Sequence, residues 1–119
     1  MSFIFDDLEN ETVWSPAVTA GELFVATANS LAGSYEVPTG LEARAADWYR
    51  VDGPIFKSFV REIAARTSQH PVLRELSRGF IATSLVILER SGYRVDDLIG
   101  EQERESFLSV EELANNMAR

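Results

Sequence analysis

The segment VPTGLEARAADWYRVDG, residues 37–53, decides how this chain folds, because its two halves predict different structures. Thr39 precedes Glu42 by three residues, which is the spacing of a helix capping box. The residues that follow Thr39 favour helix, so the first half predicts a short turn of helix over residues 41–46. The second half, residues 47–51, has the pattern of a β-strand.

That second half places Trp48 and Arg50 on one side of the expected strand, and Tyr49 and Val51 on the other. One of the two adjacent aromatic residues should therefore point outward beside an arginine, as interface anchors commonly do. Core packing is the alternative interpretation, because most aromatic side chains are largely buried. The candidate binding residues are Trp48, Tyr49 and Arg50.

Two further β-prone pieces lie near the N-terminus, at residues 2–5 and 11–14. An acidic, Asn-containing segment separates them, and this arrangement predicts a small hairpin. We interpret Asp6 and Asp7 in that segment as part of a solvated turn. Together with residues 47–51, the hairpin would form a small β element, and an edge strand in it could pair with a second copy of the chain.

Apolar residues repeat at helical spacing before and after the 37–53 segment. Ser15 offers an N-cap and Pro16 the favoured first position of a first helix, which should end before Pro38. A second helix should follow the Asp-Gly-Pro break at residues 52–54, with Asp52 or Gly53 as its cap, and its apolar residues form one stripe. This second helix is expected to pack on the core through that stripe.

The helix predicted over residues 71–91 is apolar around nearly its whole circumference toward its C-terminal half. A helix that is apolar on all sides is usually buried, so we expect it at the centre of the fold. Gly92 can take the left-handed position that ends a helix, and Tyr93 can then pack back on Leu88.

The last part of the chain is acidic and helix-prone at residues 101–107, and Ser109 begins another capping box. These signals predict one broken helix or two short ones. The predicted fold class is therefore mainly α, of the α+β kind. About four helices surround the helix at 71–91, with a small β element from residues 2–5, 11–14 and 47–51.

Length and composition bound the class of protein. The 119 residues predict a single globular domain, residues 1–119, which can bury about two-thirds of its unfolded surface. The absence of cysteine excludes disulfides and thiolate metal sites, and it suits a reducing cytosol. The N-terminus lacks the pattern of a secretory signal. The longest uncharged apolar run, residues 79–88, is far shorter than the roughly 20 residues that a membrane helix needs. We therefore expect a cytoplasmic protein without a membrane partner.

The charge balance narrows the class of partner. Nineteen acidic and eleven basic residues give a formal net charge of −8, which opposes binding to nucleic-acid phosphates. A nucleic-acid partner is therefore not expected. Solubility is the simplest interpretation of this charge, and a basic partner or imitation of a nucleic acid are the alternatives.

No known catalytic signature occurs in the sequence, and a single histidine excludes a two-histidine metal site. His70 precedes a helix start, where capping of backbone N–H groups is the expected role and a part in catalysis is the alternative. Asp47, Asp52 and Glu62 are the likeliest carboxylates if a metal binds, because hard cations need several converging oxygens. We expect no cofactor and no catalytic residue.

Six short motifs follow one another along the chain: Val13-Trp14-Ser15-Pro16, Leu23-Phe24, Val37-Pro38-Thr39-Gly40-Leu41, Val51-Asp52 with Phe56 and Phe59-Val60, His70-Pro71-Val72-Leu73-Arg74, and Leu88-Glu89-Arg90-Ser91-Gly92. In this order they resemble a family of small uncharacterised actinobacterial proteins, a domain of unknown function. The resemblance spans nearly the whole chain up to about Gly92. It implies a single small domain with no assigned activity, so it supplies no functional residues.

Three functional hypotheses follow. The first is a non-catalytic protein-interaction module, of an accessory, regulatory or immunity type. It would bind a protein partner or a second copy of the chain through Trp48, Tyr49 and Arg50. The second is a small-molecule-binding protein or small enzyme with a pocket near Trp14, Trp48 and Tyr49. The third is an acidic nucleic-acid mimic, which the interleaved arginines of the sequence make the weakest of the three.

Overall fold

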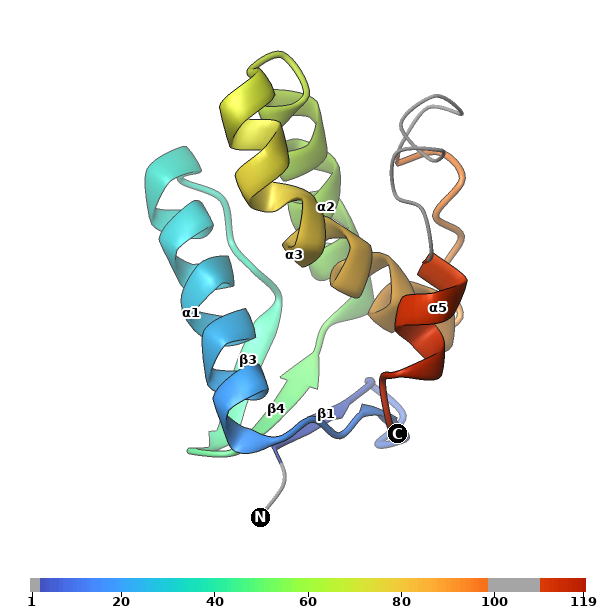
Figure 1. Cartoon of the computed structure of the whole chain (residues 1–119). Helices are drawn as coiled ribbons and strands as arrows, with labels where there is room; N and C mark the ends of the chain where they lie inside the picture. Colours follow the sequence, from blue (N-terminus) through green and yellow to red (C-terminus); the bar gives the residue numbers. More distant parts are fainter. Residues whose placement is uncertain (1–2, 99–109) are drawn as a thin grey trace.

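A four-stranded mixed sheet forms one layer of the computed structural model, which describes residues 3–98 and 110–119 (Figure 1). The strand order is β2-β1-β4-β3. Strand β1 is antiparallel to β2 and parallel to β4, while β3 is antiparallel to β4. The strands are β1 (Ile4–Asp6), β2 (Thr12–Trp14), β3 (Leu41–Ala45) and β4 (Trp48–Val51).

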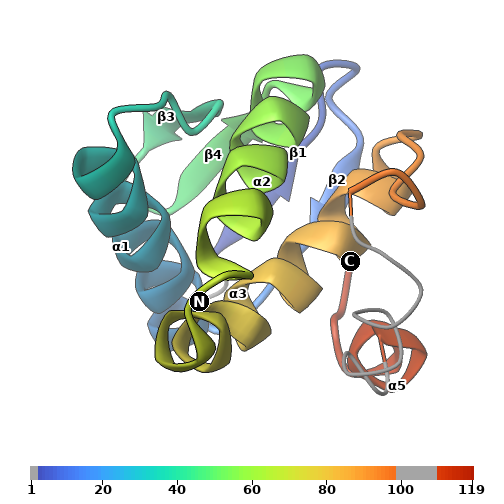
Figure 2. The ribbon, with the colours of Figure 1, turned by 90° about the horizontal axis from the view of Figure 1, so that it is seen from above.

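Helices form the second layer. They are α1 (Val18–Tyr35), α2 (Gly53–Thr67), α3 (Pro71–Arg90) and α5 (Val110–Asn115). The first three lie on one side of the sheet, and α5 packs against α3 (Figures 1 and 2). The fold is therefore α+β, and the described helices leave the other face of the sheet open.

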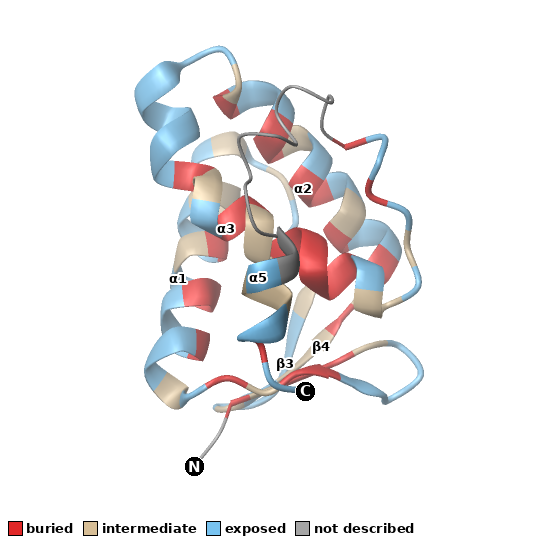
Figure 3. Ribbon diagram, turned by 45° about the vertical axis from the view of Figure 1, so that its right-hand side comes forward, coloured by how far each residue is buried: buried red, intermediate tan, exposed pale blue. Residues whose placement is uncertain are grey.

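The hydrophobic core lies between the sheet and the helices, where the inner sides of the helices are buried (Figure 3). Phe24 of α1 links the two layers, because its ring lies 5.5 Å from Phe5 of β1 and 4.9 Å from Phe80 of α3. Phe59 of α2 joins the same cluster at 6.1 Å from Phe80. Full burial of one such side chain stabilises a fold by roughly 1.5–3 kcal/mol, so this aromatic cluster is a major source of stability.

The ends of two helices match their sequence signals. Helix α2 begins directly after Asp52, whose carboxylate accepts a hydrogen bond from the Ile55 N–H at 3.2 Å. Helix α3 ends as predicted, with Gly92 in the left-handed region at φ 88°. The Tyr93 N–H donates to the Leu88 carbonyl at 3.0 Å, which is the long hydrogen bond of a Schellman motif.

The prediction of a helical turn over residues 41–46 is wrong, because these residues form strand β3. The Thr39 hydroxyl accepts from the Leu41 N–H, two residues on, and does not cap a helix. Gly40 then turns the chain at φ 78°, and its carbonyl accepts from the Asp52 N–H at 2.8 Å. The hairpin to β4 satisfies the backbone along the whole segment, whereas an isolated turn of helix is marginal at best. The sheet therefore has four strands, and β4 lies inside it and not at an edge.

The prediction of a central buried helix at residues 71–91 is also wrong. Val72 is 72% exposed, Leu76 is 76% exposed and Leu73 is 40% exposed. The first two turns of α3 lie far from the sheet, and burial begins at Ser77 (Figures 1 and 3). Helix α3 packs on the sheet and on α2 with one part of its length, so apolar composition overestimated its burial.

The predicted start of the first helix at Ser15 and Pro16 needs correction. The helix begins at Val18, and its N-cap residue Ala17 makes no side-chain capping bond. The Ser15 N–H instead donates to the Ala118 carbonyl at 2.7 Å, and the Pro16 carbonyl accepts from the Phe3 N–H at 2.8 Å. These two hydrogen bonds connect Ser15 to the C-terminal segment and Pro16 to the N-terminal segment, so the helix starts only after these two residues.

Some predictions for the chain ends cannot be compared with the structure. Ser2, residues 101–107 and Ser109 lie outside the described residues, whereas the last helix is present as α5. No helix within the described ranges, 3–98 and 110–119, combines the length and the apolar character that crossing a membrane requires.

Candidate functional site

The two adjacent aromatic residues of β4 point to opposite sides of the sheet. Tyr49 faces the helices, where its ring stacks on Phe3 at 5.5 Å and on Phe5 at 6.0 Å. Trp48 faces away from them and is 39% exposed. We call the sheet surface opposite α1, α2 and α3 the open face; its residues are Ile4, Asp6, Thr12, Glu42, Arg44, Trp48 and Arg50.

The indole of Trp48 is fixed in place by a buried carboxylate. Its Nε1–H donates to Asp6 Oδ2 at 2.8 Å, and the Thr12 hydroxyl donates to Asp6 Oδ1 at 2.8 Å. Asp6 is only 8% exposed, so both donors help to compensate the cost of burying its charge. The interpretation of Asp6 as part of a solvated turn is therefore wrong, because it belongs to β1 and anchors Trp48.

A cation covers the exposed ring of Trp48. The guanidinium carbon of Arg44 lies 5.6 Å from the centre of the indole, which is within the range of a cation–π interaction. Arg44 comes from β3, the strand that the capping-box spacing of Thr39 and Glu42 predicted to be helical. Because the indole N–H has its acceptor in Asp6, the part of the ring that Arg44 leaves exposed is apolar and held in one orientation.

Arg50 completes the open face beside Trp48. Its Nη2 lies 3.8 Å from Glu42 Oε1 on the neighbouring strand, and its side chain is 27% exposed. Its buried Nε has no hydrogen-bond partner among the residues that the structure describes. Part of the hydrogen-bonding capacity of this guanidinium is therefore left unused within the described chain.

Trp14 lies on the other side of the sheet, away from Trp48. Its ring stacks on Phe5 at 5.3 Å and meets Phe24 edge-on at 5.4 Å. It also lines an apolar groove of about 390 Å³ between α1 and α3. The structure therefore does not bring Trp14, Trp48 and Tyr49 around one pocket.

A second, more polar cavity of about 590 Å³ lies at the carboxyl ends of the parallel strands β1 and β4. Two of its charged residues, Arg90 and Asp7, have structural roles. Arg90 donates to the Val13 carbonyl at 2.9 Å and to the Ala114 carbonyl at 3.0 Å, which holds the C-terminal segment against β2. Burial, and secondarily the charge of Arg119, lowers the pKa of Arg90. Asp7 accepts from two backbone N–H groups of its own turn.

The carboxylates proposed for a metal do not converge. Asp52 caps α2, and Glu62 pairs with Arg66 at 3.0 Å on the same helix. Within residues 3–98 and 110–119, no group of three or more His, Asp or Glu side chains is placed to hold a metal ion. His70 is exposed at the start of α3 and makes no side-chain capping bond, so its predicted capping role is wrong.

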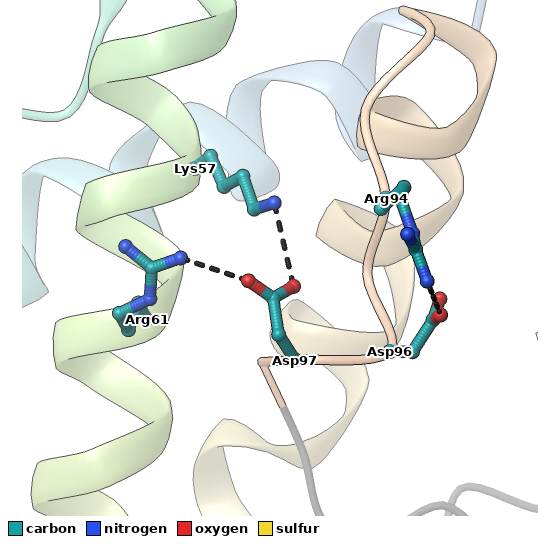
Figure 4. Close-up of polar contacts among 5 residues, drawn as sticks. All are labelled: Lys57, Arg61, Arg94, Asp96 and Asp97. Carbon is teal, nitrogen blue, oxygen red and sulfur yellow. Dashed lines mark hydrogen bonds and ion pairs between the residues drawn. The ribbon is translucent and has the colours of Figure 1, made fainter.

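A surface ion cluster attaches the segment after α3 to α2 (Figure 4). The Asp97 carboxylate lies 3.3 Å from Lys57 Nζ and 3.1 Å from Arg61 Nη2. Some loss of hydration raises the pKa of Asp97, but the hydrogen bond from Lys57, a backbone hydrogen bond, the charge of Lys57 and the hydrogen bond from Arg61 outweigh it and leave the pKa below its usual value. A lowered carboxylate pKa means that this contribution to stability is present at neutral pH and is lost as the pH falls through that pKa. Because Asp97 is exposed and paired with Lys57 and Arg61, we assign it a structural role.

We expect Asp6→Ala to lower the free energy of unfolding by about 1–3 kcal/mol, because two donors at a largely buried position lose their acceptor. The same change should loosen the indole and make Trp48 fluorescence easier to quench with acrylamide. Urea unfolding and quenching measure both effects, with Glu42→Ala on the same face as the matched control. Asp6→Ala behaving like Glu42→Ala in both measurements would show that the carboxylate does not anchor Trp48.

Comparison with known proteins places this chain in a family. No curated protein and no solved structure matches it significantly. A family model does match, and it covers residues 1–119, which includes the C-terminal part beyond the resemblance seen up to Gly92. The resemblance to a family without assigned activity is thereby confirmed, and the chain belongs to the family of unknown function DUF6086.

Proposed function

We propose that this chain is a non-catalytic, cytoplasmic protein-interaction module, of an accessory, regulatory or immunity type, that binds a partner protein through the open face of its sheet. The observation that carries the proposal is the partly exposed indole of Trp48, which is hydrogen-bonded to buried Asp6 and has Arg44 against its ring. The lack of cysteine supports the cytoplasmic assignment.

The chemistry of this face suits a protein partner. Tryptophan and arginine are the residue types most enriched among the energetic centres of protein interfaces. A side chain that is already fixed loses little conformational freedom when it binds, so more of its contact energy appears as affinity. The bond from Trp48 to Asp6 provides this fixation on a rigid strand in the interior of the sheet.

The charge of the open face differs from that of the whole chain. Arg44 and Arg50 lie beside Glu42, so the face carries both signs although the chain has a net charge of −8. Complementary charge on a partner would set its orientation more than its affinity. In this arrangement Trp48 and the two arginines contact the partner, and Tyr49 supports them from the core side.

Trp48→Ala is expected to weaken partner binding by at least about tenfold, or about 1.4 kcal/mol, without unfolding the chain. The tagged protein would capture partners from an extract of its native host, and a captured protein would then be purified and titrated calorimetrically. Ile55→Ala, at a residue of α2 that is 42% exposed, is the matched control and should bind like the wild type.

Equal affinities for the wild type and Trp48→Ala would contradict the proposal. If only Ile55→Ala lost affinity, the binding surface would lie on the helices and not on the sheet. Circular dichroism of both variants shows whether either change has altered the fold.

A further inference from the structure

The two arginines of the open face, Arg44 and Arg50, differ in their hydrogen bonding from other arginines of this chain. Neither donates a side-chain hydrogen bond to any residue within the described ranges. Five arginines elsewhere each donate such a bond to an oxygen of the chain: Arg61, Arg66, Arg78, Arg90 and Arg94. The open face therefore presents two guanidiniums with unused donors.

The carboxylates of the open face do not use these donors. Glu42 Oε1 lies 3.9 Å from Arg44 Nη1 and 3.8 Å from Arg50 Nη2, and both distances exceed that of a hydrogen bond. The Glu42 side chain is 60% exposed, so water weakens both contacts. Asp6 already accepts two side-chain hydrogen bonds and is almost fully buried. An additional anion can therefore bind without breaking a hydrogen bond of either arginine.

Arg50 is the better placed of the two arginines to bind that anion. Its side chain is 27% exposed, and its Nε is buried without a partner in the part of the chain that the structure describes. A guanidinium that has lost most of its water gains more from a carboxylate than a hydrated one, because charge-assisted hydrogen bonds are stronger where water is excluded. Its terminal nitrogens keep some exposure, so a carboxylate can approach them end-on.

We propose that the partner protein supplies this anion as the carboxylate of an aspartate or glutamate, which binds the Arg50 guanidinium beside an apolar side chain that packs on Trp48. This contact rests on the proposed function, because it lies on the same face and specifies the chemistry of the partner. Trp48 and Arg50 are two residues apart on one side of β4, so a single patch of the partner supplies both contacts. The exposed side chain of Glu42 moves aside for the incoming carboxylate.

The charge of the chain favours a protein carboxylate over a nucleic acid. A net charge of −8 repels a polyanion over most of the surface. Nucleic-acid binding depends on several basic residues that release counterions from the phosphates, whereas the open face has two arginines. A folded partner can present one carboxylate among neutral and basic side chains, and such a surface is complementary to this face.

Hydrocinnamate tests this chemistry without the partner, because it joins a carboxylate to an aromatic ring. A ¹⁵N–¹H correlation spectrum follows the Trp48 indole N–H and the Nε–H of Arg50, whose burial slows its exchange with water. Titration should shift both signals with a dissociation constant of about 1–10 mM. Hydrocinnamamide, which has the same ring without the charge, should leave the Arg50 signal in place.

Two pairs of variants separate this site from general attraction between charges. Arg50→Gln should weaken hydrocinnamate binding by at least about fivefold, whereas Arg74→Gln, at an exposed position of α3, should not change it. Glu42→Gln should strengthen binding by at least about twofold, because it removes the competing carboxylate. Glu75→Gln, at a residue of α3 whose side chain is 69% exposed, should have no effect. Equal binding by the wild type and Arg50→Gln, or no shift of the Arg50 signal at about 50 mM hydrocinnamate, would overturn the proposal.

Two further measurements identify the class of anion and the role of the partner. Phenyl phosphate that binds at Arg50 more than about tenfold tighter than hydrocinnamate would assign the site to a phosphate and overturn the carboxylate contact. With the purified partner, Trp48→Ala and Arg50→Gln should both weaken binding. A loss with Trp48→Ala alone would contradict the carboxylate contact and leave the proposed function standing, whereas a loss with neither would overturn both.

Discussion

Leu85→Ala is expected to lower the free energy of unfolding by about 2–5 kcal/mol, the range for large-to-small changes in a packed core. Leu76→Ala, two and a half turns earlier on the same helix, should change it by less than about 0.5 kcal/mol. Leu85 is 1% exposed and lies between the layers, whereas Leu76 is 76% exposed. The two leucines therefore measure how far burial extends along α3.

Urea unfolding gives both values. Equal losses at the two positions would restore the central buried helix that the apolar composition predicted. A loss below about 1 kcal/mol for Leu85→Ala would mean that its side chain is not part of the core.

Gly21→Ala is expected to lower the free energy of unfolding by about 1–3 kcal/mol, although alanine is the better helix former. A β-carbon at Gly21 would lie 2.6 Å from the Phe3 β-carbon, and Phe3 is only 2% exposed. Because Phe3 is buried, the overlap can be relieved only if its ring or α1 shifts within the packed core. The expected loss is the cost of that shift.

Gly33→Ala supplies the matched control on the same helix. A β-carbon at Gly33 meets nothing within 4 Å, so this change should stabilise the fold by about 0.4–1 kcal/mol. Thermal unfolding of the two variants should move the melting temperature in opposite directions. A stabilising effect at both glycines would show that Phe3 does not hold α1 on the sheet.

Much of the fold could be predicted from local sequence signals. The start of α2 at Asp52 and the end of α3 at Gly92 depend on neighbouring residues, and both predictions are confirmed. The helix predicted over residues 41–46 failed because the capping-box spacing is local, whereas the pairing of β3 with β4 depends on the whole hairpin. The prediction that α3 is buried along its length failed because apolar composition does not show which turns extend beyond the neighbouring elements.

Local sequence patterns predicted only part of the candidate site. Alternation along β4 identified an outward aromatic residue beside an arginine, and the structure places Trp48 in that position. The roles of Asp6 and Arg44 could not be predicted, because they depend on strand pairings. Asp6 reaches Trp48 across 42 residues of sequence, through a parallel pairing of β1 with β4 that no local pattern indicates.

The indole resonances of the two tryptophans test the proposed interaction most directly. Trp48 and Trp14 are the only tryptophans, and they lie on opposite sides of the sheet. A ¹⁵N–¹H correlation spectrum, assigned with Trp48→Phe, resolves their N–H signals during titration with the purified partner. We predict that the Trp48 signal and the backbone amides of Arg44 and Arg50 shift while the Trp14 signal stays in place. Binding that moves the Trp14 signal and leaves Trp48 unchanged would contradict a partner site on the open face.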